Sequence, residues 1–269
     1  MAEKDKKKDN YFSNEKSSKL RSIGGLLTFS TILPIHIYTN IEEMAKMTWF
    51  WPLIGALVGF IGLIIGYFLN ILNFPILVIS AIIYSFFIWF NGFHHLDGLI
   101  DIGDALMVHG TPEKKISVMR DSMIGTGGIA LFFIVGILTI FFLNSVLSIG
   151  FLFSILICEM SAKVGLVSCA ISSKSGNDGT GRYFIKSMTI PKFLITLIIT
   201  LTIGYMIGGN IGLFGVVGGI FGGALVSFIG SKNFKIATGD VLGASNEIGR
   251  LFSLFFMLVL ISISQIRIF

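Results

Sequence analysis

Long apolar segments alternate along this chain with two kinds of polar connection. A helix needs about 20 predominantly apolar residues to cross a bilayer. Seven segments come close to this length or reach it: residues 49–71, 74–93, 126–148, 150–172, 190–209, 211–230 and 248–266. The pattern predicts an all-α fold, a polytopic bundle of about seven transmembrane helices.

The connections between these segments fall into a short class and a long class. The short ones are uncharged turns near Asn73, residues 148–150 and Asn210. The long ones are polar and rich in glycine. They cover residues 94–125, 173–189 and 231–247. Because the two classes alternate along the chain, we expect all the long connections on one side of the membrane.

The N-terminal part precedes the first predicted span. Residues 1–19 are charged throughout and predict a disordered basic tail, which leaves residues 20–269 as a single integral membrane domain. Within this domain the apolar segment 22–38 is short and interrupted by Pro34. We expect it to form a helix that lies in the membrane interface or re-enters the membrane without crossing it.

The composition agrees with a membrane protein. The chain is 54% hydrophobic and 13% charged, whereas soluble domains are about 45–50% apolar and about 25% charged. The net charge is +5, and residues 1–21 hold seven of the 20 Lys and Arg residues. A polybasic segment beside membrane helices favours contact with anionic lipid headgroups, so we expect membrane lipid and no nucleic acid as a partner.

The distribution of Lys and Arg also predicts the orientation. Most of these residues lie in the tail and in the long connections, and basic residues of short loops stay in the cytoplasm. We therefore expect the N-terminus and the long connections on the cytoplasmic side of the cell (inner) membrane. With seven spans, the C-terminus would lie outside.

Glycines recur four residues apart within the predicted spans. The pairs are Gly55 and Gly59, Gly62 and Gly66, Gly215 and Gly219, and Gly219 and Gly223. This spacing lets helix backbones approach closely in lipid, so we expect these glycines to be packing positions.

The first long connection opens with an acidic motif. Asp97, Asp101 and Asp104 are spaced at i, i+4 and i+7, so on a helix they share one face. Three like charges on one face repel one another, which predicts a compensating cation. Carboxylate oxygens suit Mg²⁺, or Mn²⁺, with diphosphate oxygens and water completing the coordination. The alternative is a solvated face at the membrane surface, but the Leu and Ile residues between the acids argue against it.

His95 lies beside the acidic motif. It is a candidate general base, and a structural role at the end of a helix is the alternative. Glu159 and Lys163 lie four positions apart inside a predicted span. An ionisable residue in a span indicates a functional site by default, but an internal ion pair that fixes helix packing explains these two equally well.

Polar and glycine residues of the long connections are the candidate substrate-binding residues. An arginine there can clamp a phosphate, or simply mark the cytoplasmic side, and glycines before a helix can present backbone N–H groups to an anion. Because the long connections share one side, these residues can converge on one site. The candidates are Arg120, Asp121, Ser122, Gly125, Gly179, Gly181, Arg182, Asp240 and Glu247.

The run from His95 to Asp104, HLDGLIDIGD, resembles the signature of the cobalamin synthase family, the adenosylcobinamide-GDP ribazoletransferases. The resemblance continues in order along most of the chain. It includes residues 33–34, 50–55, 119–122 with Gly125, 179–181, and 238–244 with Glu247. Four such motifs in the right order are a fairly specific match.

The resemblance implies a Mg²⁺-dependent phosphotransferase that assembles the nucleotide loop of cobalamin. A ribose hydroxyl of α-ribazole, or of its 5′-phosphate, would attack the cobinamide-linked phosphorus of adenosylcobinamide-GDP, releasing GMP and forming adenosylcobalamin or its 5′-phosphate. Asp97, Asp101 and Asp104 would hold the metal, and one of them or His95 would accept the proton. A homo-oligomer is compatible with the sequence, which does not fix the number of protomers.

Two other functions stay open. A CDP-alcohol phosphotransferase that acts on a lipid catalyses a similar reaction, but its acids follow a different spacing, DGxxAR and then GxxxDxxxD, which this sequence lacks. A transporter built around Glu159, Lys163 and the acidic face would show no chemical turnover. The sequence shows no inverted-repeat hydropathy of the kind that many transporters have.

Overall fold

The structure is a computed structural model that describes residues 18–35, 37 and 39–266, so most of the predicted tail lies outside the described residues. The described residues form helices and no β-strand. The helices are α2 (Lys19–Ser30), α3 (Ile41–Ala45), η2 (Thr48–Phe50), α4 (Trp51–Ile71), α5 (Ile76–Phe90), α6 (His94–Met107), α7 (Pro112–Met119), α8 (Thr126–Ser148), α9 (Ser154–Ser172), α10 (Gly181–Ser187), α11 (Ile190–Phe234) and α12 (Gly239–Ile266). The prediction of an all-α polytopic bundle is confirmed.

Five described helices are long and apolar enough to cross a membrane, namely α4, α8, α9, α11 and α12, or six if the bent pair of α5 and α6 counts as one span. One of the five, α11, is 45 residues long and contains both predicted segments 190–209 and 211–230, separated at Gly209. Helix α5 alone, at 15 residues, is short for a span.

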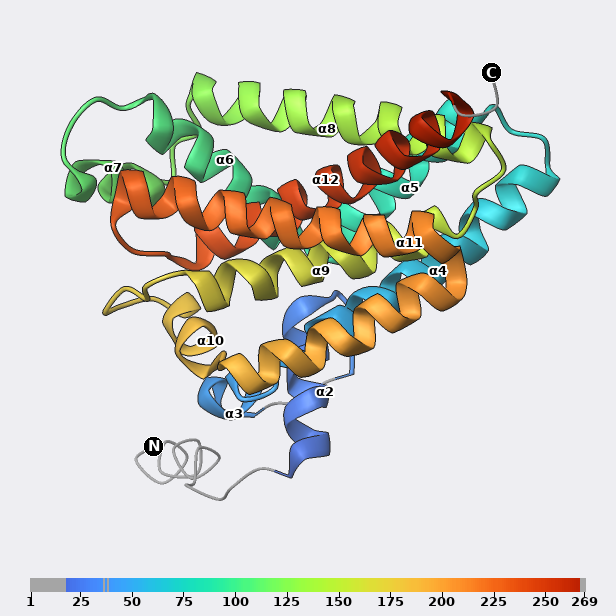
Figure 1. The fold of residues 1–269 in the computed structure, drawn as a ribbon. Coiled ribbons are helices and arrows are strands. Elements are labelled where there is room, and N and C mark those ends of the chain that lie inside the picture. The colour runs from blue at the N-terminus through green and yellow to red at the C-terminus, as the bar shows by residue number, and fades with distance from the viewer. Residues whose placement is uncertain (1–17, 36, 38, 267–269) are drawn as a thin grey trace, which may run out of the picture.

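The long helix α11 reverses direction at Gly209, which has φ 55° and ψ −139°, outside the helical region. Figure 1 shows the second half turning back from the end of the first, with the two halves spreading apart away from the turn. A Cβ added at Gly212 would lie 2.0 Å from the carbonyl oxygen of Gly204, so the two halves touch backbone to backbone. Glycine adopts a positive φ without a steric penalty, which explains how one continuous apolar segment forms a helical hairpin.

The acidic motif lies on α6, which turns away from α5 by 93°. Helix α5 measures about 22 Å at 1.5 Å per residue, whereas the hydrocarbon core is about 30 Å thick. The chain bends at Gly92 and Phe93, whose φ angles are 66° and 62°. After the bend, α6 packs against α8 and α12 instead of continuing along α5.

Helix α9 lies at the centre of the bundle and is almost completely buried. A Cβ added at Gly59 of α4 would lie 2.8 Å from the carbonyl oxygen of Leu156, and one at Gly223 of α11 would lie 1.9 Å from that of Gly165. These glycines leave no room for a side chain, so α4 and α11 pack on α9 backbone to backbone. At all seven predicted packing glycines an added Cβ would come under 3.0 Å from a neighbouring helix, which confirms their role.

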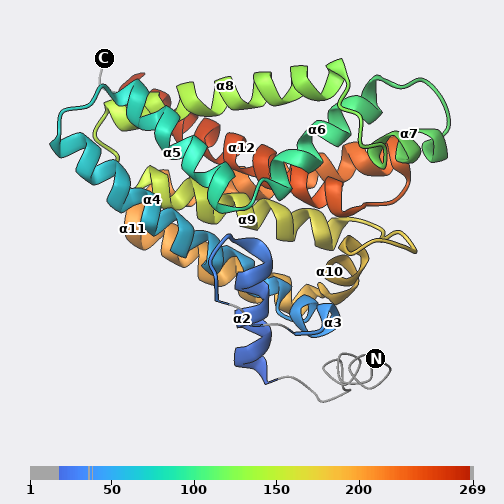
Figure 2. The ribbon, with the colours of Figure 1, turned by 180° about the vertical axis from the view of Figure 1, so that it is seen from behind.

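The bundle has two different ends (Figures 1 and 2). One end carries α7, residues 173–180, α10 and residues 235–238, and we call it the polar end. The other end carries the turns at 72–75, 149–153 and Gly209. At the polar end a backbone hydrogen bond joins the second long connection to the third: the N–H of Ala237 donates to the carbonyl of Lys174 at 2.8 Å. The long connections therefore share one end, as the sequence predicts.

All three predicted long connections are partly helical, since 94–125 contains α6 and α7 and 173–189 contains α10. In the third, 231–247, α11 continues to Phe234 and α12 begins at Gly239. Thr238 Oγ1 accepts a hydrogen bond from the backbone N–H of Val241 at 3.4 Å, which favours a helix start there. The prediction of a loop over 239–247 is wrong because Thr238 caps a helix that begins there, although the first residues of this helix are polar. Asp240 and Glu247 consequently lie on α12.

Helix α2 is 12 residues long, too short to cross a bilayer. Figures 1 and 2 show it steeply inclined to the long helices of the bundle. It is fixed to α4 because Trp51 Nε1 donates to Ser30 Oγ at 2.7 Å. Helix α2 therefore does not run parallel to the long helices from one end of the bundle to the other. Its location in the membrane interface stays a prediction.

Candidate active site

The three carboxylates of the acidic motif lie on α6, so the predicted helical face is confirmed. Their surroundings differ, however. Asp97 is exposed and lines a cavity, Asp101 is half-buried, and Asp104 is bound to the next long helix. Each carboxylate must therefore be considered separately.

Asp104 caps the N-terminus of α8. Its Oδ2 accepts from the backbone N–H of Gly125 at 2.7 Å, and its Oδ1 accepts from that of Gly128 at 2.8 Å. The first N–H groups of a helix lack partners within the helix, and a negative charge there is favoured by the helix dipole. Both carboxylate oxygens of Asp104 thus accept hydrogen bonds from the N-terminal end of α8. The N–H of Gly125, a candidate donor to an anion, is bonded to Asp104.

Asp101 lies among other carboxylates. Asp97 and Asp104 on α6 and Asp240 on α12 all repel its negative charge electrostatically. A bound cation would reduce the repulsion among these carboxylates. Among the residues that the structure describes, no three His, Cys, Asp or Glu side chains lie close enough together to hold a metal ion by themselves.

A cavity of about 260 Å³ opens beside the acidic motif. Its polar lining residues come from three places in the sequence, and they are His94, His95, Asp97, Thr180 and Asp240. Gly181, Gly239 and Gly243 also line it. Four candidate site residues therefore meet here: His95, Asp97, Gly181 and Asp240.

Close backbone contacts bring the walls of this cavity together. A Cβ added at Gly98 of α6 would lie 2.6 Å from the carbonyl oxygen of Asp240 on α12. A Cβ added at Gly181, where α10 begins, would lie 2.5 Å from the backbone nitrogen of Gly239. Any larger residue at Gly98 or Gly181 would separate these helices, so the two glycines are needed for the site to form.

Three aromatic rings, together with Leu166 and Leu242, form the apolar lining of the cavity. The rings belong to Phe29 of α2, Trp51 of α4 and Phe184 of α10, and we call them the aromatic wall. The ring centroids of Trp51 and Phe184 lie 4.7 Å apart, and those of Phe29 and Phe184 lie 5.3 Å apart. The carboxylates, by contrast, come from α6 and α12.

A chain of buried polar side chains begins at His95. Lys163 Nζ lies 3.3 Å from its Nε2 and 3.5 Å from its Nδ1. The same ammonium donates to Asn91 Oδ1 at 2.9 Å, and Asn91 Nδ2 donates to Glu159 Oε1 at 2.9 Å. A direct ion pair between Glu159 and Lys163, one of the two interpretations that the sequence left open, is therefore wrong, because Asn91 joins them instead.

Arg250 extends this chain into α12. Its Nε donates to Glu159 Oε2 at 2.9 Å, and its NH1 group donates to Glu247 Oε2. Tyr84 OH also donates to Glu247 Oε2, at 3.5 Å. These side chains are all buried. Glu247, which the sequence suggests as a substrate-binding residue, thus lies in a buried ionic cluster and not in the cavity lining.

Two candidate arginines lie at the polar end, outside the cavity lining. Arg120 donates to Asp178 Oδ2 at 2.6 Å, and both side chains are more than half exposed. Arg182 donates to the carbonyl of Asn177 and, at 2.6 Å, to Tyr183 OH. Arg120 therefore joins the first long connection to the second.

The remaining candidates are exposed residues of the same end. Asp121 Oδ1 accepts from the backbone N–H of Met123 at 3.1 Å, which closes a turn. Ser122 and Gly179 are exposed, and Gly179 has a φ of 77° that favours glycine. These residues do not line the cavity.

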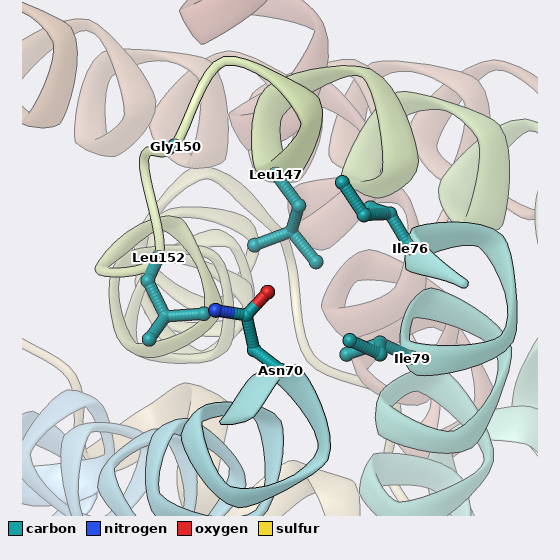
Figure 3. A pocket seen from close by; sticks show the side chains of 6 residues that line it. All are labelled: Asn70, Ile76, Ile79, Leu147, Gly150 and Leu152. Carbon is teal, nitrogen blue, oxygen red and sulfur yellow. The ribbon is translucent and has the colours of Figure 1, made fainter. Parts of the chain in front are cut away.

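A smaller cavity of about 50 Å³ lies at the opposite end of the bundle (Figure 3). Asn70 supplies its polar side chain, and the others are Ile76, Ile79, Leu147, Gly150 and Leu152. One amide and a volume of this size do not suit a nucleotide, because pockets for drug-sized ligands measure about 300–1,000 Å³. The larger cavity is therefore the candidate active site.

Residues 22–258 match the family model described as cobalamin-5-phosphate synthase. The adenosylcobinamide-GDP ribazoletransferase of Methanosarcina barkeri is 32% identical over 257 residues, which cover 88% of this chain and 91% of the relative. The ribazoletransferase of Pyrococcus furiosus is 32% identical over 230 residues, covering 84% and 94%. That of Picrophilus torridus is 29% identical over 251 residues, covering 92% and 100%. No solved structure gives a significant match.

The family match covers most of the chain. The protein belongs to the cobalamin-5-phosphate synthase family. Every candidate residue of the site lies inside the matched region, and so does the buried polar chain from Tyr84 to Arg250. In this cobalamin-5-phosphate synthase family member, the acidic motif, the cavity and the buried chain therefore all belong to the part that the family shares.

Sequence reasoning missed two parts of this site. Arg250 is an ionisable residue within the predicted span 248–266, the same signal that draws attention to Glu159 and Lys163. The aromatic wall has no such signal, because its three rings come from distant parts of the sequence and are ordinary residues for membrane helices.

Proposed function

We propose that this protein transfers the adenosylcobinamide phosphoryl group from adenosylcobinamide-GDP to α-ribazole or α-ribazole 5′-phosphate, releasing GMP and forming adenosylcobalamin or its 5′-phosphate. The relatives that it matches carry the name adenosylcobinamide-GDP ribazoletransferase. The observation that carries the proposal is the convergence of acidic side chains from α6 and α12, Asp97 and Asp240, on a cavity of nucleoside size.

The acidic side chains fit Mg²⁺, with Mn²⁺ as a substitute. One or two of Asp97, Asp101 and Asp240 would hold the ion, because they offer the hard oxygen donors that it prefers. Asp104 adds negative charge while its oxygens bond to α8. Mg²⁺ commonly binds through one or two carboxylates plus substrate phosphates and water, so a preformed cage of three protein ligands is not required. When bound, the metal neutralises charge on the diphosphate oxygens.

The reaction forms one bond and breaks one. The ribose hydroxyl oxygen of the acceptor bonds to the cobinamide-linked phosphorus, while the bond between that phosphorus and the oxygen of GMP breaks. The hydroxyl proton passes to a carboxylate at the cavity, Asp97 or Asp240. Such transfers depend mainly on positioning and on electrostatic stabilisation, which the convergent helices supply.

His95 does not suit the role of base. The Lys163 ammonium lies 3.3 Å from its Nε2 and 3.5 Å from its Nδ1. A positive charge at this distance opposes protonation of the ring. Proton acceptance therefore falls to the carboxylates.

We also propose that the polar end faces the cytoplasm at the cell membrane. The basic residues of the long connections lie at this end, among them Arg120, Arg182 and Lys235. Basic residues near span ends favour the cytoplasmic side. The water-soluble groups of both substrates would reach the cavity from that side.

Turnover by purified, full-length protein in lipid nanodiscs tests the proposal. With adenosylcobinamide-GDP, α-ribazole and Mg²⁺, we expect GMP release and a product with the mass of adenosylcobalamin. Asp97→Asn and Asp101→Asn should each lower kcat about 100-fold or more, because each removes a charge that holds the metal against the diphosphate. EDTA should abolish turnover, and added Mg²⁺ should restore it.

Glu113→Gln is the matched control, because Glu113 is an exposed carboxylate on α7 outside the cavity lining. It should turn over like the unaltered protein. Full activity in both aspartate variants would refute the assigned role of the motif, and full activity in EDTA would refute the role of the metal.

A further inference from the structure

We infer that the 260 Å³ cavity binds the acceptor substrate, with the aromatic wall stacked against the apolar base of α-ribazole. The inference rests on the proposed function. It gives one of the two substrates a defined place in the fold, which family membership does not provide.

The rings of the aromatic wall pack against one another, and Phe29, which is 40% exposed, is the accessible one. Phe184 lies between Trp51 and Phe29, with centroid distances of 4.7 and 5.3 Å and interplanar angles of 34° and 31°. The ring of Phe29 is also nearly parallel to that of His94, at 6.4 Å and 9°. Planar heteroaromatic bases bind to such surfaces by stacking, which supplies affinity without hydrogen bonds.

The wall has no free hydrogen-bonding group. Trp51 Nε1 is the polar atom of its three side chains, and it already donates to Ser30 Oγ at 2.7 Å. The base of α-ribazole is dimethylbenzimidazole, two fused rings with two methyl groups and no N–H. Guanine has several N–H donors and a carbonyl, which would lose their water partners against such a wall. The wall therefore favours the base of the acceptor over the guanine of the donor.

The volume of the cavity supports the same assignment. About 260 Å³ is slightly below the range of about 300–1,000 Å³ for pockets that enclose drug-sized ligands. A nucleoside approaches this size, whereas a corrin ring with its side chains is several times larger. The corrinoid of the donor would therefore lie outside the cavity, with its diphosphate near the carboxylates.

The position of the polar residues completes the argument. The aromatic wall comes from α2, α4 and α10, while His95, Asp97 and Asp240 come from α6 and α12. A base stacked on the wall leaves its ribose toward these three residues. The attacking hydroxyl would then lie beside the carboxylates that can take its proton.

Phe29→Ala tests the inference with the least disturbance of packing, because Phe29 is 40% exposed whereas Trp51 and Phe184 are 3% and 2% exposed. Equilibrium binding of α-ribazole is measured on full-length protein in nanodiscs without the donor, and KM is measured for both substrates. We expect Kd and KM for α-ribazole to rise about tenfold or more, with KM for adenosylcobinamide-GDP unchanged. Phe29→Trp should retain α-ribazole binding.

Phe228→Ala is the matched control, since Phe228 is a 64% exposed ring on α11 outside the cavity lining. It should leave the Kd for α-ribazole unchanged. A rise in KM for the donor alone would place guanine in the cavity and overturn the inference. Unchanged constants in Phe29→Ala, or an unaltered protein that does not bind α-ribazole, would also overturn it.

The two proposals can fail separately in this design. If the unaltered protein binds α-ribazole and Phe29→Ala weakens that binding, but no GMP is released with the donor, the proposed function fails and the assignment of the cavity stands. If GMP is released but Phe29→Ala leaves the binding of α-ribazole unchanged, the proposed function stands and the assignment of the cavity fails.

Discussion

The carboxylates of α6 differ in what their oxygens contact. Asp97 and Asp104 lie seven residues apart on one helical face, yet Asp97 lines the cavity and Asp104 accepts two backbone N–H groups of α8. Spacing along a helix places side chains on a face, but it does not determine which partner each side chain meets. The two residues should therefore respond differently to substitution.

Asp104→Ala should lower the free energy of unfolding by about 1–2 kcal/mol, because α8 loses its cap and a favourable charge at its N-terminus. Asp97→Ala should change it by less than about 0.5 kcal/mol, since Asp97 is exposed. Thermal unfolding of the purified proteins measures both. Equal loss of stability in the two variants would show that Asp104 is not a structural cap.

The elements of the fold are divided by two backbone breaks that lie at the ends of predicted apolar segments. Gly209 turns one long apolar segment into a hairpin, and the bend at Gly92 and Phe93 shortens α5 and redirects α6. The second break places the acidic motif against α12, where Asp240 lies. The sequence places a boundary at each of these positions, but only the backbone conformation gives the direction that the chain takes after it.

Gly209→Ala should lower the free energy of unfolding by about 1–3 kcal/mol. Its Cβ would meet nothing within 4 Å, so the loss would come from the positive φ alone. Asn210→Ala, at the exposed neighbouring position, is the control and should have little effect. Thermal unfolding compares the two variants, and similar midpoints for both would show that the reversal does not require glycine.

Across the whole molecule, one buried polar chain connects the helices around the site. It runs from Glu247 and Arg250 on α12, through Glu159 on α9 and Asn91 after α5, to Lys163 on α9. Lys163 then contacts the His95 ring on α6. The chain holds two carboxylates and two cations, so its formal charges balance. Charges this deep in a membrane protein are tolerated only when they are paired.

Arg250→Met should destabilise the protein strongly, by about 3–5 kcal/mol, because it leaves two buried carboxylates without their cation. Adding Glu159→Gln should recover part of this loss, since one of the unpaired charges is removed. Thermal unfolding of the single and double variants measures the coupling.

Lys46→Met is the matched control, because Lys46 pairs with Glu43 where its side chain is 53% exposed. It should cost at most about 1 kcal/mol. No difference between Arg250→Met and Lys46→Met would show that the buried chain does not stabilise the bundle.

The sequence alone predicted the membrane class, the apolar segments, the common side of the long connections and the shared face of Asp97 and Asp101. It also predicted that Gly181 and Asp240 belong to connections that can meet the acidic motif. These features follow from local composition and from the period of the helix, which can be read along the chain.

Only the tertiary structure decided that Asp104 caps α8, that Glu159 pairs with Arg250 and not with Lys163, and that Phe29 and Phe184 share one cavity. Each of these contacts joins residues that are distant in sequence, or chooses among several partners of the same chemistry. The choice depends on how closely the helices approach, and glycines set this approach, as Gly103 does between α6 and α8 and Gly165 between α9 and α12.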